Sequence, residues 1–171
     1  MKKTIIFISS IVVLTLIFVF FSHKAIEMTG DDKFCASCHV MQPMKEAYIK
    51  DVHGGNNNLG IKANCVDCHL PHDNIVNYLS TKAYNGIKEF SITAIGADEK
   101  IDWYEKLNHK KDYVYDSGCL KCHQDITNIN SKNEMQNTMH KRYLDYANEL
   151  KCVSCHTYVG HDGLRGKLDK K

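Results

Sequence analysis

The sequence predicts a mainly α-helical protein with extensive loops, in which an N-terminal transmembrane helix precedes a small domain made of two similar halves. An apolar run from Ile5 to Phe21 follows two lysines at the N-terminus. All eight cysteines fall into four copies of one short motif. Residues 73–96, between the second and third copies, have apolar side chains at the three- and four-residue spacing of an amphipathic helix.

The N-terminal apolar run is suited to a membrane anchor. Ile5–Phe21 is 17 residues long and contains only three hydroxyl side chains. A helix of that length spans about 25 Å, slightly less than a hydrocarbon core of about 30 Å, and Thr4 and Ser22 can extend it. The alternative is a cleaved signal peptide, but "SHKAIE" after the run has no Ala-x-Ala cleavage pattern. We therefore expect residues 1–24 to remain as an anchor.

Charge sets the expected orientation. Lysines before a first transmembrane helix keep that end in the cytoplasm, so residues 25–171 form a domain on the periplasmic side of the inner membrane. The formal net charge of the chain is +2, and no long basic tract is present, so a nucleic acid partner is not expected. The C-terminal "RGKLDKK" is interpreted as a solvated tail.

The four motifs all have the form Cys-x-x-Cys-His. Their cysteines are Cys35 and Cys38, Cys65 and Cys68, Cys119 and Cys122, and Cys152 and Cys155, and their histidines are His39, His69, His123 and His156. One such motif is compatible with a redox dithiol or half of a zinc site. Four copies, each closed by a histidine and with no cysteine left over for a disulfide, indicate four covalently attached c-type haems.

The spacing of the motifs indicates an internal repeat. In the first half, 11 residues separate the free histidine His53 from Cys65, and in the second half 11 residues separate His140 from Cys152. The expected dihaem repeats are about 35–72 and 119–161. Because a chain of this size has limited apolar surface, we expect short helices wrapped on stacked haems, which supply both core and cross-links.

Free histidines are expected to complete the haem irons, since imidazole is the commonest second axial ligand. His53 and His140 are favoured by their matching positions in the repeat. His161 lies five residues after His156, which is too close to serve the same haem, so it is expected to reach a neighbouring one. His72 and His109 are weaker candidates, with surface or hydrogen-bonding roles as the alternative.

Residues 73–96 form the predicted connecting helix, with Asp73 or Asn74 as its cap. Its apolar stripe comprises Ile75, Val76, Leu79, Ala83, Ile87 and Phe90, and a second, polar stripe comprises Tyr78, Lys82, Asn85 and Glu89. One interpretation is a plain amphipathic helix with a solvated polar face. The other is a quinone-binding surface, because quinol oxidation releases two protons and Lys82 and Glu89 are the ionisable groups of the polar stripe.

The first motif contains a second possible iron ligand, because "CASCHVM" places Met41 two residues after His39. The two are too close in sequence to occupy opposite faces of one porphyrin, so one excludes the other. A thioether raises the reduction potential relative to imidazole, which suits a haem that receives electrons from quinol. From the residues alone, ligation by His39 with Met41 merely packed remains an equal alternative.

Taken together, "CASCHVM", "CVDCHLP", "STKAYNG" and "CVSCHTYVGH" resemble the membrane-anchored tetrahaem quinol dehydrogenases of the NapC/NrfH family over nearly the whole chain. The resemblance implies that Met41, rather than His39, binds the first haem. It places the non-motif histidines at His53, His140 and His161, and the quinol-site lysine at Lys82. Glu89 stands where relatives can carry Asp, which leaves its role less defined.

The resemblance implies a carrier that oxidises menaquinol and passes electrons through four haems to a periplasmic multihaem reductase. The short chain, without a long C-terminal extension, favours the branch that serves ammonia-forming cytochrome c nitrite reductase. The alternatives are the same mechanism serving nitrate reductase or another terminal reductase, a self-contained multihaem reductase, and a tethered electron store without a quinol site. Quinol oxidation by the isolated protein separates the first reading from the last.

Overall fold

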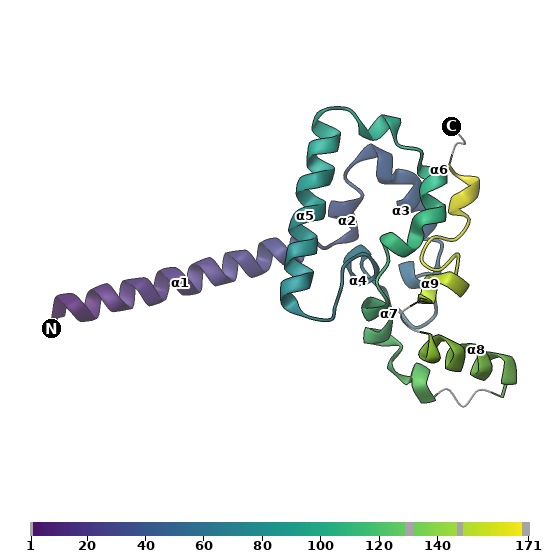
Figure 1. Cartoon of the computed structure of the whole chain (residues 1–171). Helices are drawn as coiled ribbons and strands as arrows, with labels where there is room; N and C mark the ends of the chain where they lie inside the picture. Colours follow the sequence, from purple (N-terminus) through teal and green to yellow (C-terminus); the bar gives the residue numbers. More distant parts are fainter. Residues whose placement is uncertain (1, 129–131, 147–148, 169–171) are drawn as a thin grey trace.

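The computed structural model describes residues 2–128, 132–146 and 149–168, and it is helical with extensive loops (Figure 1). The α-helices are α1 (Lys2–Met28), α2 (Asp32–Cys35), α3 (Gln42–Tyr48), α4 (Cys65–His69), α5 (Ile75–Ala94), α6 (Trp103–Lys106), α7 (Asp116–Cys122), α8 (Glu134–Asp145) and α9 (Cys152–Cys155). Short 3-10 helices are η1 (His39–Met41), η2 (Val52–Gly54), η3 (Asp98–Lys100), η4 (Leu107–Asp112), η5 (Gln124–Asn128) and η6 (Leu164–Gly166). The described ranges contain no strand, which confirms the predicted fold class.

Helix α1 projects away from the rest of the chain as a single long helix (Figure 1). It runs from Lys2 to Met28, beyond the expected boundary at residue 24, and its apolar window has no buried residue. Its 27 residues correspond to about 40 Å, more than the hydrocarbon core requires. The helix is therefore long enough to span a membrane.

Helix α5 lies between the second and third motifs, within residues 73–96, where the sequence predicts a connecting helix. Asn74 is its cap, with its side chain accepting a hydrogen bond from the backbone N–H of Asn77 at 2.8 Å. The helix crosses the C-terminal end of α1 sideways, whereas α8 and α9 lie on the side of the domain away from α1 (Figure 1). The first motif, which contains the end of α2, lies beside α5, so the chain places it close to the anchor.

The domain has very little apolar core of its own. Among the described residues, the buried apolar side chains are Ala47, Tyr48, Leu70, Val153 and Leu164. A domain of this size normally buries many more. This sparse core is consistent with a fold in which large prosthetic groups supply the interior.

Helices α4 and α7 pack directly on one another and join the second motif to the third. The Tyr115 N–H donates to the Cys68 carbonyl at 3.0 Å, and the His72 N–H donates to Ser117 Oγ at 2.9 Å. At Gly118 an added Cβ would lie 1.9 Å from the Asp67 carbonyl oxygen. The two backbones therefore touch at this position, and only glycine fits there.

Candidate functional site

The second, third and fourth motifs share one local structure. Each places its cysteines on a short helix, α4, α7 or α9, with the motif histidine at the end of that helix. The backbone N–H of His123 donates to the carbonyl of Cys119 at 2.9 Å, and that of His156 donates to Cys152 at 3.0 Å. In these three motifs one helical turn fixes the positions of the histidine and both cysteines relative to one another.

The first motif has a different backbone. Helix α2 ends at Cys35, and Cys38 is extended, with φ −78° and ψ 134°. A new 3-10 turn then begins at His39, and the Met41 N–H donates to the Cys38 carbonyl at 3.1 Å. His39 is exposed, whereas Met41 is half-buried. In the first motif, therefore, the helix does not continue to the histidine as it does in the other three motifs.

The other three motif histidines each face a non-motif histidine. The ring centroids of His69 and His161 are 6.1 Å apart. Those of His53 and His123 are 6.2 Å apart, and those of His140 and His156 are also 6.2 Å apart. Two metal–nitrogen bonds of about 2 Å, with about 1 Å from each nitrogen to its ring centre, require centroids about 6 Å apart. The residues present therefore fit one iron between each pair.

Two of these pairs connect the two halves of the domain. His53 comes from the first half and faces His123 of the second, and His161 of the second half faces His69 of the first. The pair formed by His140 and His156 lies within the second half. The halves are thus interlocked by exchanged histidines, an arrangement that the repeat spacing did not specify.

Three of these imidazoles are oriented by hydrogen bonds from Nδ1. His69 Nδ1 donates to the Tyr113 carbonyl at 2.8 Å, and His161 Nδ1 donates to the Met44 carbonyl at 3.0 Å. His53 Nδ1 pairs with Asp51 Oδ1 at 2.9 Å. Each bond leaves Nε2 as the free, electron-donating nitrogen, the arrangement that orients histidine ligands in metal sites.

Burial supports the same protonation state. Burial lowers the pKa of His69 and of His161 below the ordinary value of 6.5, although their Nδ1 contacts act in the opposite direction. Both rings are therefore neutral at physiological pH. Neutral imidazole is the form that binds a metal.

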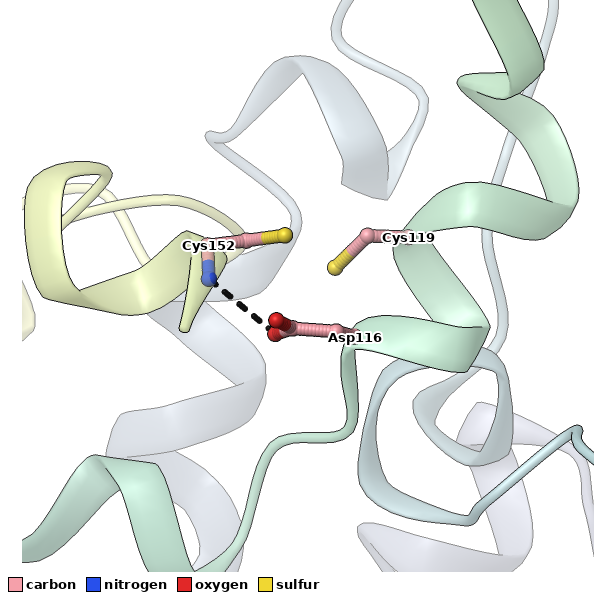
Figure 2. Close-up of side chains that lie close together, drawn as sticks. All are labelled: Asp116, Cys119 and Cys152. Carbon is pink, nitrogen blue, oxygen red and sulfur yellow. Dashed lines mark hydrogen bonds between the residues drawn. The ribbon is translucent and has the colours of Figure 1, made fainter. Parts of the chain in front are cut away.

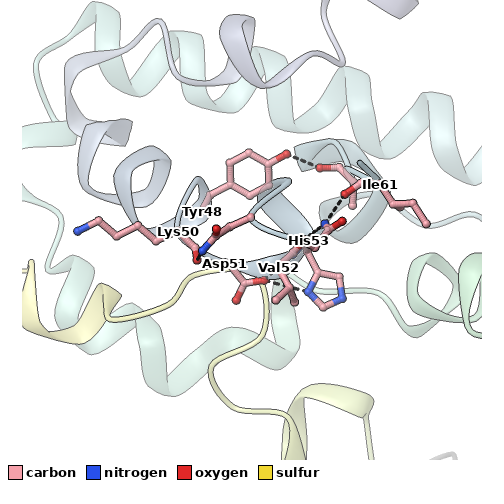
Figure 3. A network of polar contacts seen from close by, with 9 residues as sticks. Tyr48, Lys50, Asp51, Val52, His53 and Ile61 are labelled. Atoms are coloured by element: carbon pink, nitrogen blue, oxygen red, sulfur yellow. Dashed lines mark hydrogen bonds and ion pairs between the residues drawn. The ribbon is translucent and has the colours of Figure 1, made fainter. Parts of the chain in front are cut away.

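Asp51 fixes His53 at two points (Figure 3). Its carboxylate accepts the backbone N–H of His53 at 2.8 Å as well as the Nδ1 contact, and it caps helix η2. The Ala63 N–H donates to the His53 carbonyl at 2.9 Å, and the Tyr48 hydroxyl donates to the Ala63 carbonyl. The loop that carries His53 is thus held on the buried end of α3.

A cavity of about 250 Å³ opens beside the fourth motif. Its lining is Ile126, Met139, His140, Arg142, Tyr143, Leu150, Lys151, Cys152, Cys155 and His156. Both cysteines, the motif histidine and the facing histidine therefore border one space, with apolar and cationic side chains around them. His140 Nδ1 is buried without a hydrogen-bond partner within the described ranges. This lining suits an apolar macrocycle with acidic substituents.

Asp116 joins the third and fourth motifs (Figure 2). Its carboxylate accepts the Cys152 N–H at 3.0 Å and the Tyr143 hydroxyl at 2.8 Å. Its oxygen and the sulfurs of Cys119 and Cys152 all lie within 4.8 Å of one another. Such a cluster has metal-ligand character, but both thiols belong to haem-attachment motifs. The cluster therefore places the first cysteine of the third motif, Cys119, next to the first cysteine of the fourth, Cys152.

The two weaker histidine candidates are not paired in this way. His72 Nε2 contacts the Val66 carbonyl at 3.1 Å, and its ring lies 5.3 Å from that of Tyr78. His109 is exposed, and its ring nitrogens lie 3.8 Å from Glu105 and 3.7 Å from Asp112. Neither ring stands against another imidazole among the residues that the structure describes.

Three residues of the polar stripe of α5, Tyr78, Lys82 and Asn85, are half-buried near the first motif, whereas Glu89 is exposed at the edge of this region. Lys82 Nζ donates to the carbonyl of Ile26, near the end of α1, at 3.0 Å and lies 5.9 Å from the Tyr78 ring centre. Both Lys82 and Glu89 act electrostatically on the Cys35 thiol. The two ionisable groups are thus gathered where the anchor, α5 and the first motif meet.

Burial shifts both groups toward their uncharged forms. It lowers the pKa of Lys82 below the ordinary 10.5, and it raises the pKa of Glu89 above the ordinary 4.5 despite the neighbouring Lys88. A carboxyl group with a raised pKa is a stronger base once it is ionised. This is the direction that proton acceptance near neutral pH requires.

Sequence reasoning did not find the two carboxylates that support this site, Asp51 and Asp116. Asp51 lies two residues before His53, and this spacing was the available signal, because a short Asx turn lets the carboxylate reach both backbone and ring. Asp116 gave no comparable signal, since its contact with Cys152 spans 36 residues. Only the folded chain brings them together.

One apolar helix and a domain with four haem-attachment motifs define a membrane-anchored multihaem c-type cytochrome. The chain is 33% identical over 157 residues to cytochrome c-type protein TorY of Escherichia coli O157:H7, covering 86% of this chain and 42% of TorY. The model of the NapC/NirT cytochrome c family, N-terminal region, matches residues 1–165. The chain belongs to the NapC/NirT cytochrome c family.

Further relatives have different names. The tetraheme c-type cytochrome CymA of Shewanella oneidensis is 28% identical over 91% of this chain and 88% of its own length. Cytochrome c-type protein NrfH of Wolinella succinogenes is 27% identical over 81% of this chain and 72% of its own. The chain spans less than half the length of TorY and of TorC from Escherichia coli K12. No solved structure matches the chain.

Family membership confirms the expectation of covalent haem and of a single-pass membrane anchor. Because TorC, NapC, CymA and NrfH proteins all match, the comparisons do not distinguish among branches of the family.

Proposed function

We propose that this protein is a quinol dehydrogenase that takes electrons from menaquinol and delivers them to a periplasmic multihaem reductase. The anchor would hold its N-terminus in the cytoplasm and residues 25–171 in the periplasm. The observation that most strongly supports this function is the position of Lys82, which is bonded to Ile26 near the end of the anchor and lies close to Cys35 of the first motif. A polar, ionisable surface thus lies between the membrane and the first haem-attachment site.

The ligand assignments follow from the ring pairs. Covalent haem c supplies one-electron oxidation and reduction. We assign Met41 to the first haem. The extended backbone at Cys38 separates His39 from the helix of its own motif, whereas the other three motif histidines lie at the end of theirs. The remaining assignments are His69 with His161, His123 with His53, and His156 with His140. These three haems would need no ligand from a partner protein.

Lys82 and Glu89 would handle the oxygens and protons of the quinol. Lys82 has an ammonium donor that can bind a quinol oxygen, and Tyr78 and Ile26 hold it in place. Glu89 would accept a proton, because burial raises its pKa toward the range where proton transfer is efficient. Quinol loses its two protons one at a time, and the exposed Glu89 would pass each proton to water before it accepts the next.

For the terminal partner, we propose an ammonia-forming cytochrome c nitrite reductase. A relative named NrfH matches over 81% of this chain and 72% of its own length, which supports this partner. The nitrate-reductase branch is the alternative, because NapC of Paracoccus pantotrophus matches at 28% identity over 61% of its length. No internal substrate site was identified by sequence, so turnover of nitrite without a partner is not expected.

The test is reduction of the full-length protein in proteoliposomes by a menaquinol analogue, followed by addition of purified nitrite or nitrate reductase. We expect haem reduction without a partner, and nitrite consumption when nitrite reductase is added. Haems that dithionite reduces but menaquinol does not would contradict the quinol dehydrogenase assignment. Faster coupling to nitrate reductase would move the protein to the other branch.

A further inference from the structure

Helix α5 points its apolar face away from the protein. Its exposed apolar side chains are Ile75 at 67% exposure, Val76 at 70%, Leu79 at 39%, Ile87 at 70% and Phe90 at 76%. The side chains partly covered by the domain include Tyr78, Lys82 and Asn85. On a helical projection, with about 100° per residue, the centres of the two faces lie about 120° apart.

This orientation is the reverse of that expected for a helix on a water-soluble domain. Such a helix buries its apolar stripe against the core and turns its polar side to solvent. Here Tyr78, Lys82 and Asn85 are turned toward the domain, and the apolar stripe has no cover from the part of the chain that the structure describes. A contiguous apolar surface of this kind marks a binding surface.

The position of α5 identifies what covers that face. Lys82 donates a hydrogen bond to the Ile26 carbonyl near the end of α1. Helix α5 therefore contacts the anchor close to the point where the anchor leaves the membrane. The helix runs crosswise to α1 (Figure 1). If α1 follows the membrane normal, α5 lies in the plane of the membrane surface, at the height of the headgroups.

We propose that α5 is an interfacial helix that lies in the periplasmic headgroup layer, with Ile87 and Phe90 among the acyl chains. Interfacial helices have this combination of a strong apolar face, a separate polar face and an orientation in the membrane plane. Tyr84, at 66% exposure on the edge of the apolar face, is a side chain that suits the headgroup level. The exposed Lys88 can reach the phosphates from the same helix.

The consequence of this placement for quinol access rests on the proposed function. A long-chain quinol has a tail as apolar as the acyl chains, so it stays in the membrane. With α5 at the interface, the quinol would pass sideways from the bilayer to the polar stripe without crossing water. Lipid contact would then be part of substrate access as well as of anchoring.

Photo-cross-linking of the full-length protein in native membranes tests the placement. The photoreactive residue p-benzoylphenylalanine replaces Ile87 or Phe90. Leu14, in the middle of α1, is the positive control position. Lys106, an exposed residue of α6 on the side of the domain away from α1, is the negative control.

We expect lipid adducts, seen as phospholipid mass shifts, at Ile87, Phe90 and Leu14, and none at Lys106. Cross-links from Ile87 and Phe90 to a second copy of this chain or to a reductase, in place of lipid, would overturn the proposal. Lack of a lipid adduct at both positions, with adducts at Leu14, would also overturn it.

A second readout separates this inference from the quinol site. The Ile87→Asp/Phe90→Asp variant should reduce at least severalfold the rate with long-chain menaquinol embedded in liposomes, while the rate with a short-chain, water-soluble quinol changes little. Equal losses with both quinols would refute lateral access. If wild-type protein oxidises neither quinol but still forms lipid adducts, the proposed function fails and the membrane placement of α5 stands.

Discussion

The imidazole rings of His140 and His156 have centroids 6.2 Å apart and nearly parallel planes, inclined by 11°. One ring comes from α8 and the other from the end of α9. They border the cavity that also contains Cys152 and Cys155 on its wall. A motif histidine, two attachment cysteines and a second imidazole thus meet in one place, and two further histidine pairs have nearly the same spacing.

The first prediction concerns these non-motif histidines. His53→Ala, His140→Ala and His161→Ala should each convert one haem in four from low-spin to high-spin, because each removes one axial imidazole and the thioether bonds keep the haem in place. Electron paramagnetic resonance measures the change. His72→Ala is the matched control, since its Nε2 contacts Val66, and its spectrum should equal that of wild type. Wild-type spectra in all three variants would show that these histidines are not ligands.

The second prediction concerns Met41. Met41→His should lower one haem midpoint potential, because imidazole stabilises oxidised iron more than a thioether does. The expected shift is on the order of 100 mV within the range that axial ligands set. In His39→Asn preparations that retain four haems, all potentials should stay at wild-type values. Potentiometric titration gives both results, and the opposite pattern would assign the first haem to His39.

The third prediction concerns packing between α4 and α7. Gly118→Ala should destabilise the domain by about 1–3 kcal/mol, because its Cβ would overlap the Asp67 carbonyl. Gly86→Ala, in α5, meets nothing within 4 Å and should be neutral or stabilising by up to about 1 kcal/mol. Thermal unfolding of the mature proteins compares them. Equal stability of the two variants would mean that the α4–α7 contact is looser than described.

The fourth prediction concerns pH. Because burial raises the pKa of Glu89, its carboxyl stays protonated to a higher pH than an ordinary glutamate, and only the ionised form accepts a proton. Quinol oxidation should therefore rise with pH through this raised pKa, above the ordinary 4.5, and then level off. Stopped-flow rates between about pH 5 and 8 report the profile. In Glu89→Gln the rising limb should disappear; its persistence would assign the base to another group.

The sequence was sufficient to predict the class of fold, the anchor helix, the four motifs and the connecting helix. These features depend on local patterns, namely an apolar run, a five-residue motif and a period of 3.6 residues. Repeat spacing also selected His53 and His140. It did not reveal that His53 faces His123 across the two halves, because that pairing depends on tertiary packing.

Two further features were beyond local pattern. The amphipathic pattern of α5 is the same whether its apolar side faces a core or a membrane, and only the contact of Lys82 with Ile26 gives its direction. The carboxylate of Asp116 reaches Cys152 over a long separation in sequence, so nothing near Asp116 predicted its role. In both cases the sequence did not show which distant segment of the chain packs against the residue in question.

The central claim is that the polar stripe of α5 binds quinol and accepts its protons, and the most direct measurement is the rate of haem reduction by a menaquinol analogue in Lys82→Ala and Glu89→Ala. Haem content and reduction by dithionite serve as checks on folding, and Lys106→Ala and Glu105→Gln on α6 serve as matched charge controls. We predict at least a tenfold loss of quinol oxidation in each α5 variant, with haem content, dithionite reduction and both controls at wild-type values. Wild-type quinol oxidation in both α5 variants would contradict the claim.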